Sequence, residues 1–248
     1  MKASLAAAVQ LAIADYGVQF SNALSTGPVA ENSFIREAST TLILPDVNSP
    51  QTGNLALWPG MGTSDGDLIQ GLAISNTQGT SGCSAAGRGV WCIVASTLES
   101  KTEKYHLERP VKMGEAVAAE PGSSVTFHYK YNDQTSQYDQ TVSLNGEVVS
   151  RLSTSSGKAQ GWGTAIECQQ SACGTVPSHQ YVDTKASPIS PVMCNFSAAD
   201  DAQLIMDVAD PSYIQTLGTT GATGDMVTDD NGKTWTIDTI NIDSYTYE

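Results

Sequence analysis

Two polar side chains interrupt otherwise apolar segments, and together they could carry acid–base chemistry. Gln70 stands in the apolar segment 68–74, and Glu167 ends the mostly uncharged segment 161–167. A carboxyl group buried among apolar residues has a raised pKa and can serve as general base or acid in an acidic medium. A nearby carboxamide can donate N–H to a developing oxyanion while it stays neutral. Gln70 and Glu167 are therefore the candidate catalytic residues.

Other catalytic arrangements have little support in the sequence. The chain has no Walker loop and no His-Glu-x-x-His segment. His106, His128 and His179 show no metal-ligand spacing, so we expect no metal and no cofactor. A Ser-His-Asp triad stays open, although nothing favours it. Structural roles are open as well, with Gln70 bonded to backbone inside a sheet and Glu167 at the rim of a disulfide hairpin.

The elements that must position these residues are strands. Four segments are rich in Thr, Val, Ile and aromatic residues, and several alternate with period two: 39–44, 68–74, 124–131 and 234–242. Asn145-Gly146 between 140–144 and 147–150 is the strongest hairpin signal in the chain. Many short strands without alternating helices predict an all-β fold, an antiparallel double-sheet β-sandwich.

The domain organisation is simple. We expect one β-sandwich domain over residues 31–248, preceded by an N-terminal segment over 1–30. The cationic, alanine-rich start of that segment fits either a signal peptide or a short helix over 2–15. A second helical turn is expected at 198–203, and the Asp-, Thr- and Gly-rich region 198–233 is expected to form long loops.

The cysteines are spaced for disulfides. Cys83 and Cys92 are nine residues apart, Cys168 and Cys173 are five apart, and both spacings suit bridges across hairpins. Zinc would need a second close pair of thiols or histidines in register. We predict these two disulfides and leave Cys194 as a free, buried thiol, with a different pairing as the alternative.

The composition of the chain argues against some classes of binding partner. The chain has 12 Lys+Arg against 26 Asp+Glu, a formal net charge of −14, whereas phosphate binding needs a clustered cationic face. No apolar run approaches the roughly 18 residues of a membrane span. The acidity fits either simple solubility or operation in acid. With the disulfides and the sequon at 195–197, we expect a secreted, extracellular, acidic monomer that binds neither nucleic acid nor membrane.

Several short motifs occur in an order that resembles the glutamic peptidases, the eqolisin family. The motifs are Leu44-Pro45, Trp58 to Gly60, Ile69 to Gly71, Val90 to Cys92, Gly114-Glu115 and Ile166-Glu167. This resemblance implies a β-sandwich similar to concanavalin A-like lectins and glucanases. It also implies a secreted acid endopeptidase that uses one glutamine and one glutamate.

The resemblance assigns roles to individual residues. Gln70 matches the family's glutamine, and Trp58, Gly60 and Trp91 are the candidate substrate-binding residues. Each tryptophan also has a structural explanation, as a core aromatic.

The sequence departs from the family pattern at its second catalytic position. The family's segment reads Glu-Trp-Ile-Val-Glu, with the first glutamate catalytic. Here Glu167 fits the second glutamate and the first falls on Gly163. Residues four apart share a strand face but lie about 13 Å apart along it. Acidic positions that flank the dyad in the family correspond here to Gly62 and to Ile74 or Ser75, which weakens the implied activity.

Three functions follow. The favoured one is a secreted, acid-acting, endopeptidase-like hydrolase in which Glu167 deprotonates a water while Gln70 stabilises the oxyanion of a polypeptide substrate. The alternative is a non-catalytic β-sandwich that binds a carbohydrate or another extracellular ligand through Trp and Tyr faces. A polysaccharide-active enzyme would need paired carboxyl groups, and the nearest pair, Asp65 and Asp67, is typical of a turn. Fold alone does not choose among them, so enzymatic activity stays an open question.

Overall fold

The computed structural model describes residues 18–76, 83, 88–100, 111–169, 172–184, 204–213 and 218–247. The larger strands are β1 (Gln19–Ser25), β2 (Ile35–Ile43), β3 (Asn54–Thr63), β4 (Leu68–Asn76), β5 (Trp91–Leu98), β8 (Ser124–Asn132), β9 (Gln137–Leu144), β10 (Glu147–Thr154), β11 (Ala159–Cys168), β13 (His179–Thr184) and β18 (Ile237–Ile242). The short strands are β6 (Val111–Met113), β7 (Val117–Ala119), β12 (Gly174–Val176), β14 (Leu204–Met206), β15 (Gly218–Thr220), β16 (Ala222–Thr223), β17 (Thr234–Trp235) and β19 (Tyr245–Tyr247).

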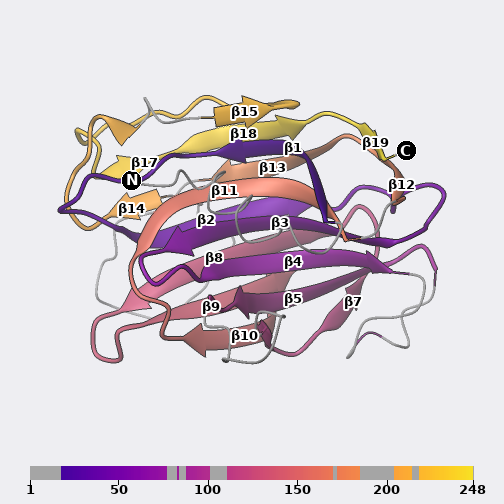
Figure 1. The fold of residues 1–248 in the computed structure, drawn as a ribbon, viewed down its shortest axis with the longest axis horizontal. Coiled ribbons are helices and arrows are strands. Elements are labelled where there is room, and N and C mark those ends of the chain that lie inside the picture. Colours follow the sequence, from indigo (N-terminus) through magenta and orange to yellow (C-terminus); the bar gives the residue numbers. More distant parts are fainter. Residues whose placement is uncertain are drawn as a thin grey trace.

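The strands form two antiparallel layers (Figure 1). The first, called the site layer below, has the strand order β5-β4-β3-β11-β1-β15, with β6 and β7 against β5. The second, the back layer, has the order β10-β9-β8-β2-β13-β18-β16, with β14 beside β2. The predicted all-β, antiparallel double-sheet β-sandwich is therefore confirmed.

The two layers pack through a single large apolar core. The hydroxyl of Tyr129 on β8 donates to the carbonyl oxygen of Pro59 on β3 over 2.8 Å. A Cβ atom at Gly71 on β4 would lie 2.0 Å from the ring of Phe127 on β8. Because the aromatic ring reaches the opposite backbone, only glycine fits at position 71. This close packing fixes which side chains of the site layer face inward and which face outward.

The hairpin predicted at Asn145-Gly146 is confirmed. Leu144 pairs with Glu147 across a two-residue turn between β9 and β10. Asn145 and Gly146 have φ values of 50° and 88°. This left-handed pair is the conformation that Asn-Gly favours at a two-residue hairpin.

Some expectations differ from the structure. Within the expected N-terminal segment 1–30, the described part contains β1, which pairs with β11 in the site layer. Region 198–233 was expected to be loops, but its described part holds the short strands β14, β15 and β16. These strands have two or three residues each, which is too short for a period-two pattern to register. The helices expected at 2–15 and 198–203, Cys194 and the sequon lie outside the described residues.

Candidate functional site

The outer face of the site layer carries both candidate catalytic residues. On β4, Ile69 points inward and is fully buried, whereas Gln70, Leu72 and Ile74 point outward and keep 7%, 8% and 8% exposure. Leu72 and Ile74 belong to a second apolar cluster, separate from the core between the layers, made of Ala56, Trp58, Leu68, Leu72, Ile74, Cys83, Cys92, Val94 and Ala165. This face therefore retains slight contact with solvent, which the inner face lacks.

Gln70 lies in a row of residues that crosses the site layer. It pairs with Ser96 on β5 and with Gly60 on β3, and Gly60 in turn pairs with Gly163 on β11. A Cβ atom at Gly60 would lie 3.2 Å from Cβ of Gln70. The two glycines therefore leave the backbone next to Gln70 without side chains, at the position where the family resemblance puts its first glutamate.

Two polar atoms in this row lack hydrogen-bond partners. Oε1 of Gln70 and Oγ of Ser96 are buried and bond to no other atom of the described chain. Ser96 itself is fully buried. Buried polar atoms are nearly always paired in folded proteins, and an unpaired one costs about 1–3 kcal/mol. Of the two residues, only Gln70 keeps some exposure, at 7%, so its amide is the unpaired polar group nearest the surface in this row.

Glu167 lies in a different row of the same face. It pairs with Phe20 on β1 and with Ala56 on β3, and Ala56 pairs with Ile74 on β4. Its exposure is 8%. The surroundings of the carboxyl group within its row are thus apolar.

The structure does not bring Gln70 and Glu167 together. Their rows meet β3 at Gly60 and Ala56, four residues apart, and the two residues stand on strands on either side of β3. Regular sheet spacing gives roughly 13 Å along the strands and 10 Å across them, or about 16 Å between the Cα atoms. An amide and a carboxyl group that share one water need to lie within about 6 Å. The two groups share a face without forming a dyad.

Neutral N–H donors hold the carboxyl group of Glu167. Nε1 of Trp58 donates to Oε2 over 3.0 Å, and Nε2 of Gln169 donates to Oε1 over 2.9 Å. Burial raises the pKa of Glu167 above its ordinary value, and the two hydrogen bonds oppose that rise only in part. No cation in the described part of the chain forms an ion pair with this carboxyl group.

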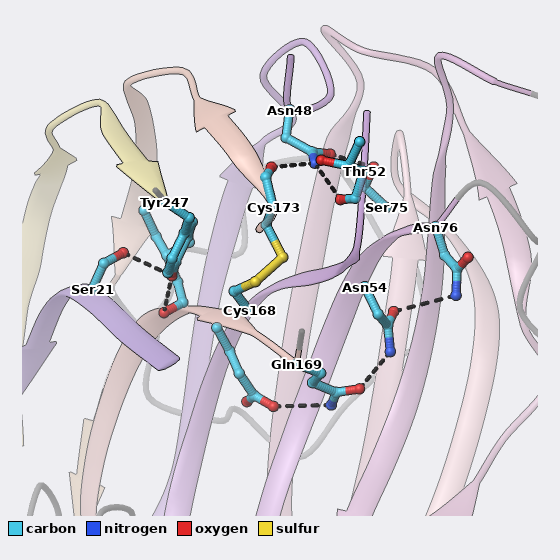
Figure 2. The surroundings of a disulfide bond; sticks show 12 residues. Ser21, Asn48, Thr52, Asn54, Ser75, Asn76, Cys168, Gln169, Cys173 and Tyr247 are labelled. Atoms are coloured by element: carbon cyan, nitrogen blue, oxygen red, sulfur yellow. Dashed lines mark hydrogen bonds between the residues drawn. A yellow bond between two sulfur atoms is a disulfide. The ribbon is translucent and has the colours of Figure 1, made fainter. Parts of the chain in front are cut away.

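An amide chain extends from Glu167 across the end of the layer. Nδ2 of Asn54 donates to Oε1 of Gln169, and Nδ2 of Asn76 lies 3.5 Å from Oδ1 of Asn54. Figure 2 shows these amides beside the disulfide of Cys168, the residue before Gln169. The orientation of the Gln169 amide is therefore fixed from both sides.

Trp58, Gly60 and Trp91 occupy different places. Trp58 lies on the outer face, with its ring edge against Phe20 at a centroid distance of 6.4 Å and an exposure of 2%. Gly60 lies in the row of Gln70. Trp91 belongs to the core between the layers, fully buried, and its Nε1 donates to the carbonyl oxygen of Pro45. Trp91 therefore faces away from the surface that holds Gln70 and Glu167.

Both predicted disulfides are present. Cys83 bonds to Cys92 and Cys168 bonds to Cys173. Cys92 belongs to the outer-face cluster, in the row of Glu167 by way of Ile74. One disulfide therefore includes the residue next to Glu167, and the other includes Cys92, which lies in the row of Glu167 on β5.

Residues 62–66 have the Gly-x-Ser-x-Gly spacing of a hydrolase nucleophile elbow. In the structure this segment turns between β3 and β4, two antiparallel strands, whereas an elbow joins a strand to a helix. Oγ of Ser64 donates to Asp65 and accepts the backbone N–H of Lys158. Oδ1 of Asp67 accepts the backbone N–H of Ser100. Within the described chain Ser64 has no histidine partner, so the segment is a structural turn.

No three His, Cys, Asp or Glu residues within the described ranges gather closely enough to hold a metal ion. In those ranges, no helix has the length and apolar character needed to cross a bilayer.

Comparisons with known proteins find only distant similarity. No protein-family model matches the sequence, and no curated protein matches it. Among solved structures, scytalido-glutamic peptidase with a peptide-based transition-state analogue aligns at 14% identity and a TM-score of 0.44, over 90% of this chain and 98% of that one. A family 16 glycoside hydrolase from the Bacteroides ovatus mixed-linkage glucan locus, bound to a product, aligns at 12% identity and a TM-score of 0.37, over 59% and 66%. A Bacteroides ovatus family 16 endo-glucanase complex gives the same values.

Proposed function

We propose that the outer face of the site layer binds an extended polypeptide and that the protein acts as a secreted binding module. The observation that carries this proposal is the unpartnered Oε1 of Gln70, next to the unpartnered Oγ of Ser96 and the bare backbone at Gly60. An extended polypeptide supplies a backbone N–H group for Oε1 of Gln70, which the side chain turns outward to meet because this atom is buried, and apolar side chains for the surrounding cluster. The two disulfides support an oxidising, extracellular setting.

The same geometry argues against hydrolysis by a Gln/Glu dyad. Water activation needs the base and the oxyanion donor to contact one tetrahedral centre. With Gln70 and Glu167 about 16 Å apart by sheet spacing, no single carbonyl reaches both. Gly163 pairs with Gly60 in the row of Gln70 and has no side chain to act as base.

A carbohydrate ligand is less well supported. Sugar rings stack on exposed aromatic faces, but Trp58 is 2% exposed and its N–H is engaged by Glu167. The other three tryptophans lie in the core between the layers. Tyr129 and Tyr138 are also buried there. None of these aromatic residues therefore offers the exposed ring face that a sugar site needs.

Hydrolysis by Glu167 without Gln70 is the second candidate function. One observation favours it, which is a buried carboxyl group whose pKa burial raises, since such groups gather at catalytic sites. In this form the protein would be an acid-acting hydrolase with Glu167 as its general acid or base.

The test uses one unfolded protein, reduced and alkylated serum albumin, with two readouts at pH 4 and pH 7. Binding is measured by fluorescence polarisation of the labelled chain, and cleavage by the release of new amino termini. We expect saturable binding without cleavage, and Gln70→Leu should weaken binding about tenfold through loss of one hydrogen bond. Gln180→Leu is the matched control, because Gln180 lies on β13 in the back layer.

Three outcomes would count against the proposal. Absence of binding, or equal binding by the Gln70 variant, would overturn the binding site. Release of new amino termini that Glu167→Gln abolishes would replace the binding module with the hydrolase.

A further inference from the structure

Glu167 is a charged residue on an otherwise apolar part of the outer face. The residues in its row are Phe20, Ala56, Ile74 and Cys92. Among the described residues the titratable neighbour is Tyr247 on β19, whose hydroxyl lies 3.0 Å from Oγ of Ser21 and 3.2 Å from the carbonyl oxygen of Ile166. Within the described residues the carboxyl group of Glu167 has no positively charged partner.

The carboxylate keeps unused acceptor capacity. Each carboxylate oxygen can accept about two hydrogen bonds, and among the described residues each accepts one, from Trp58 or from Gln169. Both donors are neutral, so they orient the carboxylate without neutralising it. Burial favours the protonated form of this carboxyl group, whereas an approaching ammonium or guanidinium group favours the ionised form, so its binding draws out a charge-assisted hydrogen bond to a preoriented carboxylate.

The net charge of the whole chain also favours a cationic ligand. The formal net charge of −14 favours association with cationic ligands and raises their local concentration at the surface. Glu167 keeps 8% exposure on the outer face.

We propose that Glu167 forms a subsite for a lysine or arginine side chain of the bound polypeptide. This inference rests on the proposed function, because it takes Gln70 as the site of backbone contact. The separation of about 16 Å between the two residues corresponds to about five residues of extended chain at 3.3 Å each. The preferred ligand is thus an apolar-rich segment with a basic residue about five positions from the residue that donates to Gln70.

The experiment compares three synthetic peptides of twelve apolar residues that differ at one position. One carries lysine there, one carries norleucine, which has the same chain length without charge, and one carries acetyl-lysine. Dissociation constants are measured by fluorescence polarisation at pH 7 and at pH 3. At pH 7 we expect the lysine peptide to bind about tenfold more tightly than the other two, which is the effect of one charge-assisted hydrogen bond. At pH 3 Glu167 is protonated and the preference should vanish.

Variants separate this inference from the function on which it rests. Glu167→Gln keeps the shape of the side chain and should lose the lysine preference while it still binds the norleucine peptide. Gln70→Leu should weaken all three peptides by the same factor. Glu147→Gln, at an exposed carboxyl on β10 in the back layer, is the matched control and should keep the preference. Thermal unfolding of each variant confirms that the fold is retained.

The outcomes are distinct. If wild-type protein binds the lysine and norleucine peptides equally at pH 7, the cation subsite is refuted and the binding face survives. If Glu167→Gln keeps the lysine preference, the subsite lies elsewhere and the assignment fails. If none of the peptides binds, both the subsite and the proposed function fail.

Discussion

Nε1 of Trp58 donates a 3.0 Å hydrogen bond to Oε2 of Glu167, and the two residues lie on neighbouring strands of the outer face. The tryptophan that the sequence suggests as a substrate platform is therefore a partner of the carboxyl group. The N–H stabilises the ionised form of Glu167, whereas burial stabilises the protonated form.

Replacing Trp58 by phenylalanine should raise the pKa of Glu167 further. The change removes one hydrogen bond that stabilises the ionised form, so the protonated form gains. The pKa is read from the carbon chemical shift of the carboxyl group during an NMR titration. Trp235→Phe is the matched control, because Nε1 of Trp235 is buried without a partner among the described residues and the ring belongs to the core between the layers. A Trp58→Phe variant with an unchanged Glu167 pKa would mean that the bond does not influence ionisation.

Gln169 supplies the second donor, and the disulfide beside it should matter for the same group. Cys168→Ala with Cys173→Ala frees the residue next to Gln169, although the backbone N–H of Gln169 still bonds to the carbonyl oxygen of Asn54. We expect a rise in the Glu167 pKa that is smaller than the rise caused by Gln169→Ala. The same titration measures it. The paired variant Cys83→Ala with Cys92→Ala is the control, since that bridge does not hold a donor to Glu167.

The two bridges should also contribute differently to stability. Loop-closure entropy predicts a loss of about 2 kcal/mol for the Cys168–Cys173 bridge and about 3 kcal/mol for the Cys83–Cys92 bridge, because the second closes the longer loop. Urea denaturation of the two double variants gives the free energies of unfolding. The opposite order would show that native-state contacts around Cys168 outweigh the loop-length effect.

Local sequence signals account for much of the fold. Asn145-Gly146 fixes its own turn because the needed backbone conformation depends on those two residues. The two disulfides follow from spacing along the chain. In contrast, β1 contains Ser21, Asn22 and Ala23, which have little strand preference, and it forms because it pairs with β11.

The site depends on register between distant strands, which sequence reasoning cannot supply. Position 163 falls in the row of Gln70 only because β11 pairs with β3 in one register, and a shift by one residue would turn Glu167 to the other face. The hydrogen bond between Trp58 and Glu167 joins residues 109 positions apart. The inward direction of Trp91 likewise depends on which face of β5 meets the back layer.

Gly71 should be intolerant of any side chain. A Cβ atom there would lie 2.0 Å from the ring of Phe127, so Gly71→Ala forces the two layers apart or turns the ring. We expect a loss of about 3 kcal/mol in the free energy of unfolding, measured with urea. Phe127→Ala removes the obstacle. The double variant should therefore lose about 1–3 kcal/mol less in free energy of unfolding than the sum of the two single losses. Strict additivity would show that the glycine is needed for another reason.

His179 should make the folded state sensitive to acid. The imidazole is buried, burial lowers its pKa to about 4, and its Nδ1 lies 3.0 Å from the carbonyl oxygen of Pro177. The unfolded chain binds a proton near pH 6.5, whereas the folded chain binds it only near pH 4. As pH falls between these values, protonation favours the unfolded state, and the loss reaches about 3 kcal/mol below pH 4. Glu167 acts in the opposite direction, because a raised carboxyl pKa lets the folded state take up its proton first.

His179→Gln removes that titration and should flatten the decline of stability from pH 6.5 to pH 4 by about 3 kcal/mol. The measurement is the free energy of unfolding by urea at half-unit pH steps. His128→Gln is the control, because the side chain of His128 is 34% exposed and bonds to Glu37, so most of the decline should remain. If His179→Gln and the wild type lose stability in parallel over this range, the folded protein accommodates a charged imidazole at position 179, and its acid response arises from the carboxyl groups.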